Sequence, residues 1–167
     1  MTFEVVPLDV DHELGSFDSS APELDRWLRE HARTATGQGT RTYVVVGAQA
    51  AVVGYFAIAP HTIDREVLSR QTSRGAPRHI PAILLAKLAL SRDLHGRGLG
   101  GELLVVALGT ILDAARRAGG RFVIVDAIDE RAAAFYTHHE FEPTPTNPLR
   151  LVRKLSTIAR ALGQTWP

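Results

Sequence analysis

The sequence predicts an α/β (α+β) fold in which about six strands and several helices form one small domain. Three observations carry this prediction: two neighbouring β-branched runs, a later apolar run that ends in a cluster of glycines, and a long amphipathic helix pattern after that cluster. With 167 residues and 45% hydrophobic residues, the chain can bury one sizeable core but is short for two. We therefore expect residues 1–167 to form a single domain.

Six segments are expected to form strands, because they are apolar or β-branched and end at glycine, proline or polar residues. In chain order they are residues 3–6, 40–46, 51–59, 83–90, 122–127 and 149–155. The second and third are expected to pair as an antiparallel hairpin with its turn near residues 47–49. The fourth is apolar almost throughout, which is typical of a strand that is buried on both faces.

Three segments have the periodicity of helices. The first begins near Pro22 and places its less polar residues at helical spacing, with Ser20 as the expected N-cap. The second runs from residue 98 or 99 to Gly119, and the third covers residues 129–139 with Asp129 as N-cap. Residues 61–81 are expected to be a short helix or loop. The tail 156–167 has helical composition, and the sequence assigns it no role.

Composition excludes several classes of function. The chain has no cysteine, so disulfides, thiolate metal sites and a cysteine nucleophile are excluded. No two histidines stand at metal-ligand spacing on one helix face, so no metal is expected. The N-terminus lacks a signal-peptide pattern and the apolar runs are broken by charges, so a cytoplasmic protein is expected. The net charge of +1 gives no global case for nucleic-acid binding, which would need a local cluster of arginines.

The most informative motif is the run of glycines between the apolar strand 83–90 and the following helix. Glycine at positions 96, 98 and 100 allows the backbone to turn its N–H groups inward, and the helix adds the positive end of its dipole. Such a turn is suited to binding a pyrophosphate. A Rossmann site would follow the first strand of a βαβ unit, with an acidic ribose ligand downstream, and a Walker loop would contain Gly-Lys-Ser/Thr. Neither pattern is present here.

The motif resembles that of the GNAT N-acetyltransferases, Gln/Arg-x-x-Gly-x-Gly/Ala, which binds the pyrophosphate of acetyl-CoA. It spans His95 to Gly100, and His95 departs from the usual Gln or Arg. A second segment, Phe135-Tyr136-x-x-x-Glu140-Phe141, is similar to the family's Phe-Tyr-x-x-x-Gly-Phe, with Glu140 in place of glycine. The resemblance implies the GNAT acyltransferase fold: a mixed, mostly antiparallel sheet of six to seven strands flanked by about four helices.

The resemblance also implies site residues. Tyr136 is the expected catalytic acid, which protonates the departing thiolate of coenzyme A. A free backbone N–H near Leu90 is the expected oxyanion donor. The residues expected to contact acetyl-CoA are Leu88, Ala89, Leu90, His95, Gly96, Arg97, Gly98, Leu99, Gly100, Gly101 and Phe135.

More of the chain resembles one branch, the GNAT toxins of bacterial toxin–antitoxin pairs. The similar segments are spread over nearly the whole sequence: His12, Phe17, Leu24-x-x-Trp27-Leu28, residues 39–43, 54–56 and 80–89, His95-Gly96 and Phe135-Tyr136. This resemblance implies acetylation of the amino group of aminoacyl-tRNA, a block of translation, a ribbon-helix-helix antitoxin as partner and a homodimer. The cations expected to contact tRNA phosphates are Arg29, Arg33, Arg41, Arg78, Lys87 and Arg92.

Two other functions stay open at this point. The same fold could acetylate a small-molecule amine or a protein N-terminus, because fold alone does not choose the acceptor. The domain could also bind acetyl-CoA without turnover. The preferred amino acid, the identity of any general base, the dimer geometry and the mode of neutralisation are not encoded in any motif that we recognise.

Overall fold

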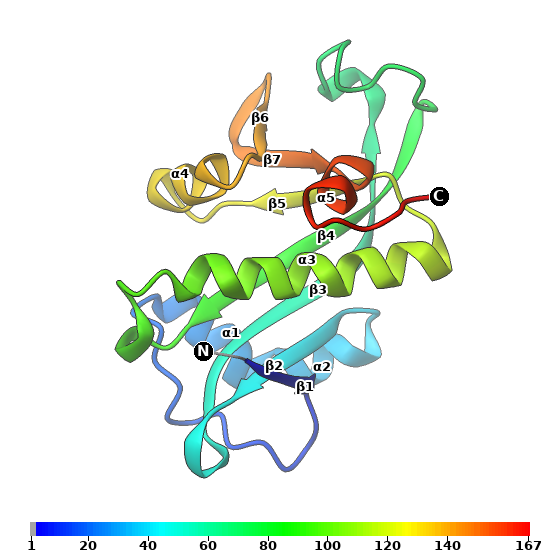
Figure 1. Ribbon diagram of the computed structural model, residues 1–167. Helices are drawn as coiled ribbons and strands as arrows, with labels where there is room; N and C mark the ends of the chain where they lie inside the picture. Colours follow the sequence, from blue (N-terminus) through cyan, green and yellow to red (C-terminus); the bar gives the residue numbers. More distant parts are fainter. Residues whose placement is uncertain (1–2) are drawn as a thin grey trace. The chain divides into compact units, whose positions relative to one another are not determined.

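The structure is a computed structural model that describes residues 3–167 (Figure 1). The described chain contains seven strands and five α-helices, so the predicted mixed α/β fold is confirmed. The strands are β1 (Glu4–Pro7), β2 (Arg41–Val46), β3 (Val52–Asp64), β4 (His79–Leu90), β5 (Phe122–Asp126), β6 (Glu142–Thr144) and β7 (Asn147–Lys154). The helices are α1 (Pro22–Glu30), α2 (Ala32–Gly37), α3 (Leu99–Ala118), α4 (Glu130–His138) and α5 (Leu155–Ala161).

The seven strands form a sheet in the order β1-β2-β3-β4-β5-β7-β6. The pairs β1–β2, β2–β3, β5–β7 and β6–β7 are antiparallel, and β4–β5 is parallel. The parallel register runs from Ala82 opposite Phe122 to Leu85 opposite Val125. Because parallel strands need a crossover connection, the long helix α3 joins β4 to β5.

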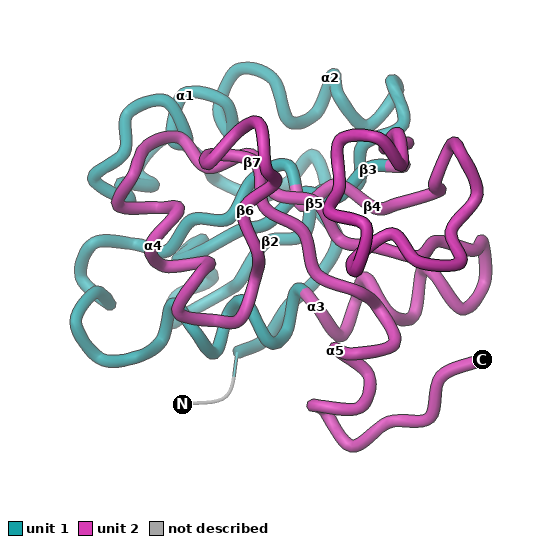
Figure 2. Tube along the Cα trace, turned by 90° about the horizontal axis from the view of Figure 1, so that it is seen from above, with its two compact units in different colours: residues 1–59, 86–107 teal, residues 60–85, 108–167 magenta. Residues whose placement is uncertain are grey.

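The chain is divided into two compact units, each built from two separate stretches (Figure 2). Unit 1 contains residues 1–59 and 86–107, and unit 2 contains residues 60–85 and 108–167. The expectation of a single domain over residues 1–167 stays a prediction, and each unit is described below by itself.

Unit 1 has a core between α1, α2 and the strands β2 and β3. Leu28, Ala32, Val44 and Tyr55 are all fully buried there. The amphipathic pattern predicted after Pro22 explains this, since residues three and four apart share one helix face. Fully burying one such large apolar side chain contributes roughly 1.5–3 kcal/mol.

An aromatic stack orders the same core. The ring of Trp27 stacks on that of Tyr55 with centroids 6.0 Å apart, and Phe17 meets Tyr55 edge-on at 5.7 Å. The hydroxyl of Tyr55 donates a 2.6 Å hydrogen bond to the carbonyl oxygen of Leu24. This bond satisfies a buried polar group and fixes α1 against β3.

Unit 2 has a core on one face of the strands β5 and β7 and the adjoining halves of β3 and β4. It contains Ile63, Ile80, Phe122, Ile124 and Val152, which are all at most 2% exposed. These residues alternate along their strands, as expected for a sheet face that packs against other residues. Leu68 and Ala76, from the connection between β3 and β4, also pack into this core.

Several sequence-based boundaries were wrong. The segment 61–81 was expected to be a short helix or loop, but β3 continues to Asp64 and β4 already begins at His79. Pro60 and Pro81 conceal these strand ends, because proline usually ends a strand pattern. Strand β6 was not predicted, and α5 begins at Leu155, inside the last predicted strand.

The predicted N-cap of the first helix was also wrong. Ser20 adopts a positive φ of 71°, and the N-cap position is occupied by Ala21 with no side-chain cap. Instead, the buried carboxylate of Asp25 accepts hydrogen bonds from the N–H and the hydroxyl of Ser19. Asp25, an acidic residue in the first turn of α1, therefore holds the segment that precedes the helix.

Candidate active site

The glycine turn lies at the junction where β4 passes into α3. After β4 ends at Leu90, the N–H of Ser91 donates to the carbonyl oxygen of Val53, and residues 92–94 form a short 3-10 turn. Gly96 and Gly98 adopt φ angles of 78° and 73°. A Cβ atom at either glycine would meet no atom within 4 Å, so the positive φ, not lack of space, requires glycine at these positions.

The backbone amides of this turn are available for a ligand. In the described part of the chain, the N–H groups of residues 96–101 have no protein acceptor, and the first bond of the helix runs from Glu102 to the carbonyl of Gly98. The first N–H groups of any helix lack an intrahelical partner. They carry the positive end of the dipole of α3, which is 20 residues long. Residues 96–101 therefore offer N–H donors to which an anion, such as two linked phosphates, can bind.

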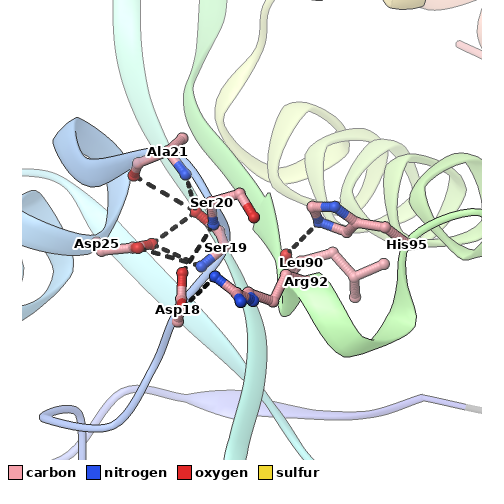
Figure 3. A network of polar contacts seen from close by, with 8 residues as sticks. All are labelled: Asp18, Ser19, Ser20, Ala21, Asp25, Leu90, Arg92 and His95. Carbon is pink, nitrogen blue, oxygen red and sulfur yellow. Dashed lines mark hydrogen bonds and ion pairs between the residues drawn. The ribbon is translucent and has the colours of Figure 1, made fainter.

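The structure explains the unusual His95. Its Nε2 lies 2.8 Å from the carbonyl oxygen of Leu90, to which it donates a hydrogen bond (Figure 3). The imidazole thereby closes the loop between the end of β4 and the start of the glycine turn. Arg97, by contrast, is exposed, and no protein partner is found for its side chain among the described residues.

A second set of contacts holds the same loop to the segment before α1 (Figure 3). The N–H of Arg92 donates to the carbonyl oxygen of Asp18 at 2.9 Å, and its guanidinium Nη1 lies 3.1 Å from the Asp18 carboxylate. Next to Asp18, Ser19 is held by the buried Asp25. Sequence reasoning missed Asp18, because no local pattern reveals a contact between residues 74 positions apart. It also missed Asp25, which bonds to Ser19 six positions earlier, outside the helix.

The residues expected to flank acetyl-CoA on β4 are placed in unit 1. Ala89 and Leu90 are buried and Leu88 is half-buried. A Cβ atom on Gly54 of β3 would approach the carbonyl oxygen of Ala89 to 3.2 Å, so glycine permits the close approach of the two backbones here.

Phe135 and Tyr136 belong to unit 2 and lie on α4. The N-cap Asp129, correctly predicted, accepts a 2.8 Å hydrogen bond from the N–H of Ala132. Tyr136 is 9% exposed and meets the rings of Phe135 and Phe141 edge-on at 5.2 and 5.6 Å.

The environment of Tyr136 fixes its protonation state. Burial raises the pKa of its hydroxyl well above the ordinary value of 10, so the phenol is neutral near pH 7. No hydrogen-bond partner for this hydroxyl is found among the described residues. Tyr136 can therefore donate a proton or a hydrogen bond. It is not suited to be a base.

Glu140 ends α4 in the conformation that glycine usually supplies. Its φ is 71°, and the N–H of Phe141 donates to the carbonyl oxygen of Tyr136. The helix therefore closes with a left-handed residue as in the related motif, although the side chain differs. The carboxylate of Glu140 pairs with Arg153 at 3.1 Å.

Three of the six cations expected to contact RNA are engaged by the protein. Arg33 donates to the carbonyl oxygens of Asp9 and His12, and Arg41 donates to the carbonyl oxygens of Thr36 and Thr40. Arg92 is paired with Asp18, as described above. These three side chains support loops or helix ends of unit 1.

The other three are less constrained. Lys87 places its Nζ 5.6 Å from the ring centroid of Trp27, which is a cation–π contact. Arg29 is exposed on α1. The pKa of the neighbouring Glu30 is lowered chiefly by its hydrogen bond to Arg26, and the charge of Arg29 adds a small effect. Arg78 is exposed in the connection between β3 and β4.

Two negative findings concern the described residues alone. Within residues 3–167, no three histidine or acidic side chains are grouped as a metal site. No described helix combines the length and the apolar character needed to cross a membrane.

The comparisons with known proteins point to one group. No protein-family model matches the chain. A tRNA-acetylating toxin of Mycobacterium tuberculosis is 39% identical over 150 residues, which cover 90% of this chain and 90% of the relative. The solved structure of AtaT complexed with acetyl-methionyl-tRNAfMet is similar with a TM-score of 0.86 and 25% identity, over 96% of this chain and 99% of that chain.

A third similar protein is a Tyr-to-Phe mutant of the AtaT toxin, solved with the C-terminus of the antitoxin AtaR and acetyl-CoA. Its TM-score is 0.81 at 25% identity, over 97% of this chain and 99% of that chain. The arrangement of strands and helices is thus shared over nearly the full length of the chain.

Proposed function

Because the chain belongs to the GNAT acetyltransferase toxins of toxin–antitoxin systems, we propose that it moves an acetyl group from acetyl-CoA to the amino group of aminoacyl-tRNA. The modified tRNA would no longer support translation, which is how the protein would act as a toxin. The observation that carries the proposal is the free row of amides at residues 96–101, in a chain of this family.

The donor side of the site is formed by the glycine turn. The amides of residues 96–101 would receive the pyrophosphate of acetyl-CoA, and the exposed Arg97 would add a charged contact. Leu88, Ala89 and Leu90 would flank the pantetheine arm, with Phe135 near the thioester. His95 would act indirectly by holding the loop through Leu90.

The chemistry needs little help from a protein base. An α-amino group titrates near about 7.7–8.0, and esterification to tRNA lowers this value, so much of the acceptor is neutral at neutral pH. Attack on the thioester forms the new C–N bond and an oxyanion, for which a backbone N–H near Leu90 is the proposed donor. When the oxyanion collapses, the C–S bond breaks, the attacking nitrogen loses its extra proton to solvent, and the thiolate needs a proton.

Tyr136 is the group that we propose to supply this proton. Its hydroxyl is neutral and has no competing partner in the described chain. A coenzyme A thiol should titrate near about 8.5, like a cysteine thiol. The thiolate is therefore a weaker base than the phenolate of Tyr136, so the free pKa values do not favour transfer of the proton from Tyr136 to sulfur. The transfer would be assisted in the transition state, where the hydroxyl donates a hydrogen bond to the sulfur as negative charge develops on it.

The acceptor RNA would be held through its phosphates. Arg29, Arg78 and Lys87 fit this role best, because no hydrogen bond from their side chains to a carboxylate or carbonyl group is found within residues 3–167. Arg33, Arg41 and Arg92 could contribute only through N–H groups that they do not use within the protein.

The partners follow from the family. An antitoxin of the ribbon-helix-helix type would neutralise the enzyme, and the working form would be a homodimer in the cytoplasm. The similar toxin solved with the C-terminus of its antitoxin supports an antitoxin partner.

The decisive experiment supplies radiolabelled acetyl-CoA together with charged tRNA, uncharged tRNA and simple amines. Label that enters charged tRNA and is released with the amino acid by mild base is the expected result. Label that enters small amines or protein N-termini alone would contradict the acceptor that we propose. Uptake of acetyl-CoA without any label transfer would indicate a non-catalytic binding module.

A further inference from the structure

Three polar side chains from three strands of unit 2 form a connected cluster. They are His61 on β3, Asp126 at the end of β5 and Arg150 on β7, and we call them the His–Asp–Arg cluster. The Nε of Arg150 lies 2.9 Å from Oδ1 of Asp126, and its Nη2 lies 3.3 Å from Oδ2. The same Nη2 lies 3.0 Å from Nε2 of His61.

The cluster continues the sheet face that carries the core of unit 2. Asp126 is directly opposite Arg150 in the antiparallel register of β5 and β7. Two residues further along their strands, Ile63, Ile124 and Val152 belong to that core. Side chains two residues apart share a face, so the cluster lies at the rim of the packed region.

The hydrogen bonds within the cluster determine which of its donor and acceptor atoms stay available to a ligand. Arg150 has no acceptor atom, so it must donate to Nε2 of His61, and the proton of the neutral ring is then on Nδ1. Burial lowers the pKa of His61, and so does the charge of Arg150. The charge of Asp126 partly offsets these effects by raising the pKa.

The groups without a partner favour a ligand that both donates and accepts hydrogen bonds. Both hydrogens of Arg150 Nη2 are used, whereas its Nη1 and the Nδ1–H of His61 have no partner among the described residues. Each oxygen of Asp126 accepts one bond from Arg150 and keeps a lone pair free. The side chains of Asp126 and Arg150 are 54% and 27% exposed, so a ligand can reach them.

This arrangement selects among ligand classes. The charges of Arg150 and Asp126 cancel and His61 is neutral, so a phosphate group would gain little there and would face a carboxylate. An aminoacyl ester has an amine N–H and a carbonyl oxygen on adjacent carbons, which is one donor beside one acceptor. The cluster presents the complementary pair, the carboxylate of Asp126 beside the free guanidinium Nη1 of Arg150.

We propose that the His–Asp–Arg cluster binds the aminoacyl end of the acceptor, with Asp126 accepting from the amine, the free Nη1 of Arg150 donating to the ester carbonyl, and His61 holding the guanidinium in place through Nη2. This inference rests on the proposed function and names the residues that recognise its substrate. It agrees with the position of Asp126 at the carboxyl end of a strand in the parallel pair β4–β5, where ligands of sheets with parallel strands usually bind. Because Arg150 offsets its charge, Asp126 can orient a neutral amine without strongly favouring the ammonium form.

The test compares two acceptors with the full-length enzyme: aminoacyl-tRNA, and an aminoacyl-adenosine that retains the amine and the ester but lacks phosphates. The variants are Asp126→Asn, Arg150→Gln and His61→Gln. Glu140→Gln is the matched control for Asp126→Asn, because it removes the carboxylate from another arginine pair that involves β7. The readouts are kcat and KM for each acceptor, the Kd of acetyl-CoA by calorimetry, and the melting temperature.

For Asp126→Asn and Arg150→Gln we expect a loss of about tenfold or more in kcat/KM, mainly through KM, as is typical for losing a hydrogen bond to a charged group. The loss should be similar for both acceptors, and the Kd of acetyl-CoA should stay within about twofold of the wild-type value. His61→Gln leaves the ion pair in place, so it should fold normally and lose several-fold in kcat/KM. It keeps the inference testable if an ion-pair variant does not fold.

Three results would overturn the inference. Unchanged kcat/KM in folded variants would leave the cluster as a structural tie between β5 and β7. A loss with aminoacyl-tRNA alone would identify an RNA contact instead of an aminoacyl contact. An equal loss in Glu140→Gln would identify a general effect on the unit. If the wild-type enzyme labels no aminoacyl-tRNA, the proposed function itself fails, and this inference fails with it.

Discussion

The requirement for glycine in the 96–101 turn leads to a quantitative prediction. Gly98 has a φ of 73°, and a Cβ atom there would meet nothing within 4 Å. Gly98→Ala therefore introduces only the conformational penalty of a left-handed alanine, about 1–2 kcal/mol. For a chain of this length, this corresponds to a melting temperature lower by roughly 2–8 °C.

Gly109→Ala is a control on the same helix. Gly109 lies within α3, where a Cβ atom also meets nothing within 4 Å, and its φ is not positive. Alanine is favoured over glycine in a helix by about 1 kcal/mol, so this variant should be more stable than the wild type. The two alanine variants should thus differ by about 2–3 kcal/mol in the free energy of unfolding, with opposite signs.

The same pair of variants tests the anion site. If the backbone of Gly98→Ala relaxes towards negative φ, one or more amides of the turn rotate away from the ligand. We expect the Kd of acetyl-CoA, measured by calorimetry, to rise by about tenfold or more, the equivalent of about 1.4 kcal/mol. Gly109→Ala should keep its wild-type Kd. Equal shifts in the two variants, or a wild-type Kd in Gly98→Ala, would refute the role of this turn.

Three further predictions concern polar groups that are buried or partly buried. Tyr136→Phe should keep its affinity for acetyl-CoA and lose most turnover. The control Tyr55→Phe should keep turnover and lose about 1–2 kcal/mol of stability, because a buried 2.6 Å hydrogen bond is removed. Normal turnover in Tyr136→Phe would exclude Tyr136 as the acid. Asp25→Asn should cost about 1–3 kcal/mol in a denaturant titration, because the bonds to Ser19 lose their charged acceptor. Burial chiefly, together with neighbouring cations, lowers the pKa of His139 below its ordinary 6.5, so its contribution to stability is complete above that pH and is lost as the pH falls through the lowered value. His139→Gln should therefore show a smaller fall in melting temperature than the wild type between about pH 7 and about pH 5.5, and an identical fall would contradict this assignment.

The sequence was most informative where structure depends on neighbouring residues. The glycine turn could be predicted because a buried strand, three alternating glycines and a helix pattern follow one another directly. The N-cap Asp129 could be predicted for the same reason, since it bonds to a residue three positions away. Both features depend on contacts within one turn of the chain.

Contacts between residues that are distant in the chain could not be predicted from the sequence. Nothing in the residues around His95 indicates that its ring donates to the carbonyl oxygen of Leu90. In the sequence, Arg92 cannot be distinguished from an exposed arginine that binds phosphate. Its ion pair with Asp18 joins positions 74 residues apart. The His–Asp–Arg cluster draws on three strands, so its members could be recognised only after β5 and β7 were seen in register.

The division of each compact unit into two stretches of sequence has a consequence for synthesis. Unit 1, which contains the glycine turn, needs residues up to 107, whereas unit 2, which contains Tyr136, needs residues up to 167. At about 5–20 residues per second, roughly 3–12 s separate these two points. A ribosome would therefore carry a nascent chain with all the residues of the glycine turn well before the unit that contains Tyr136 is complete. A chain with both units complete would therefore form only after residue 167 has been translated.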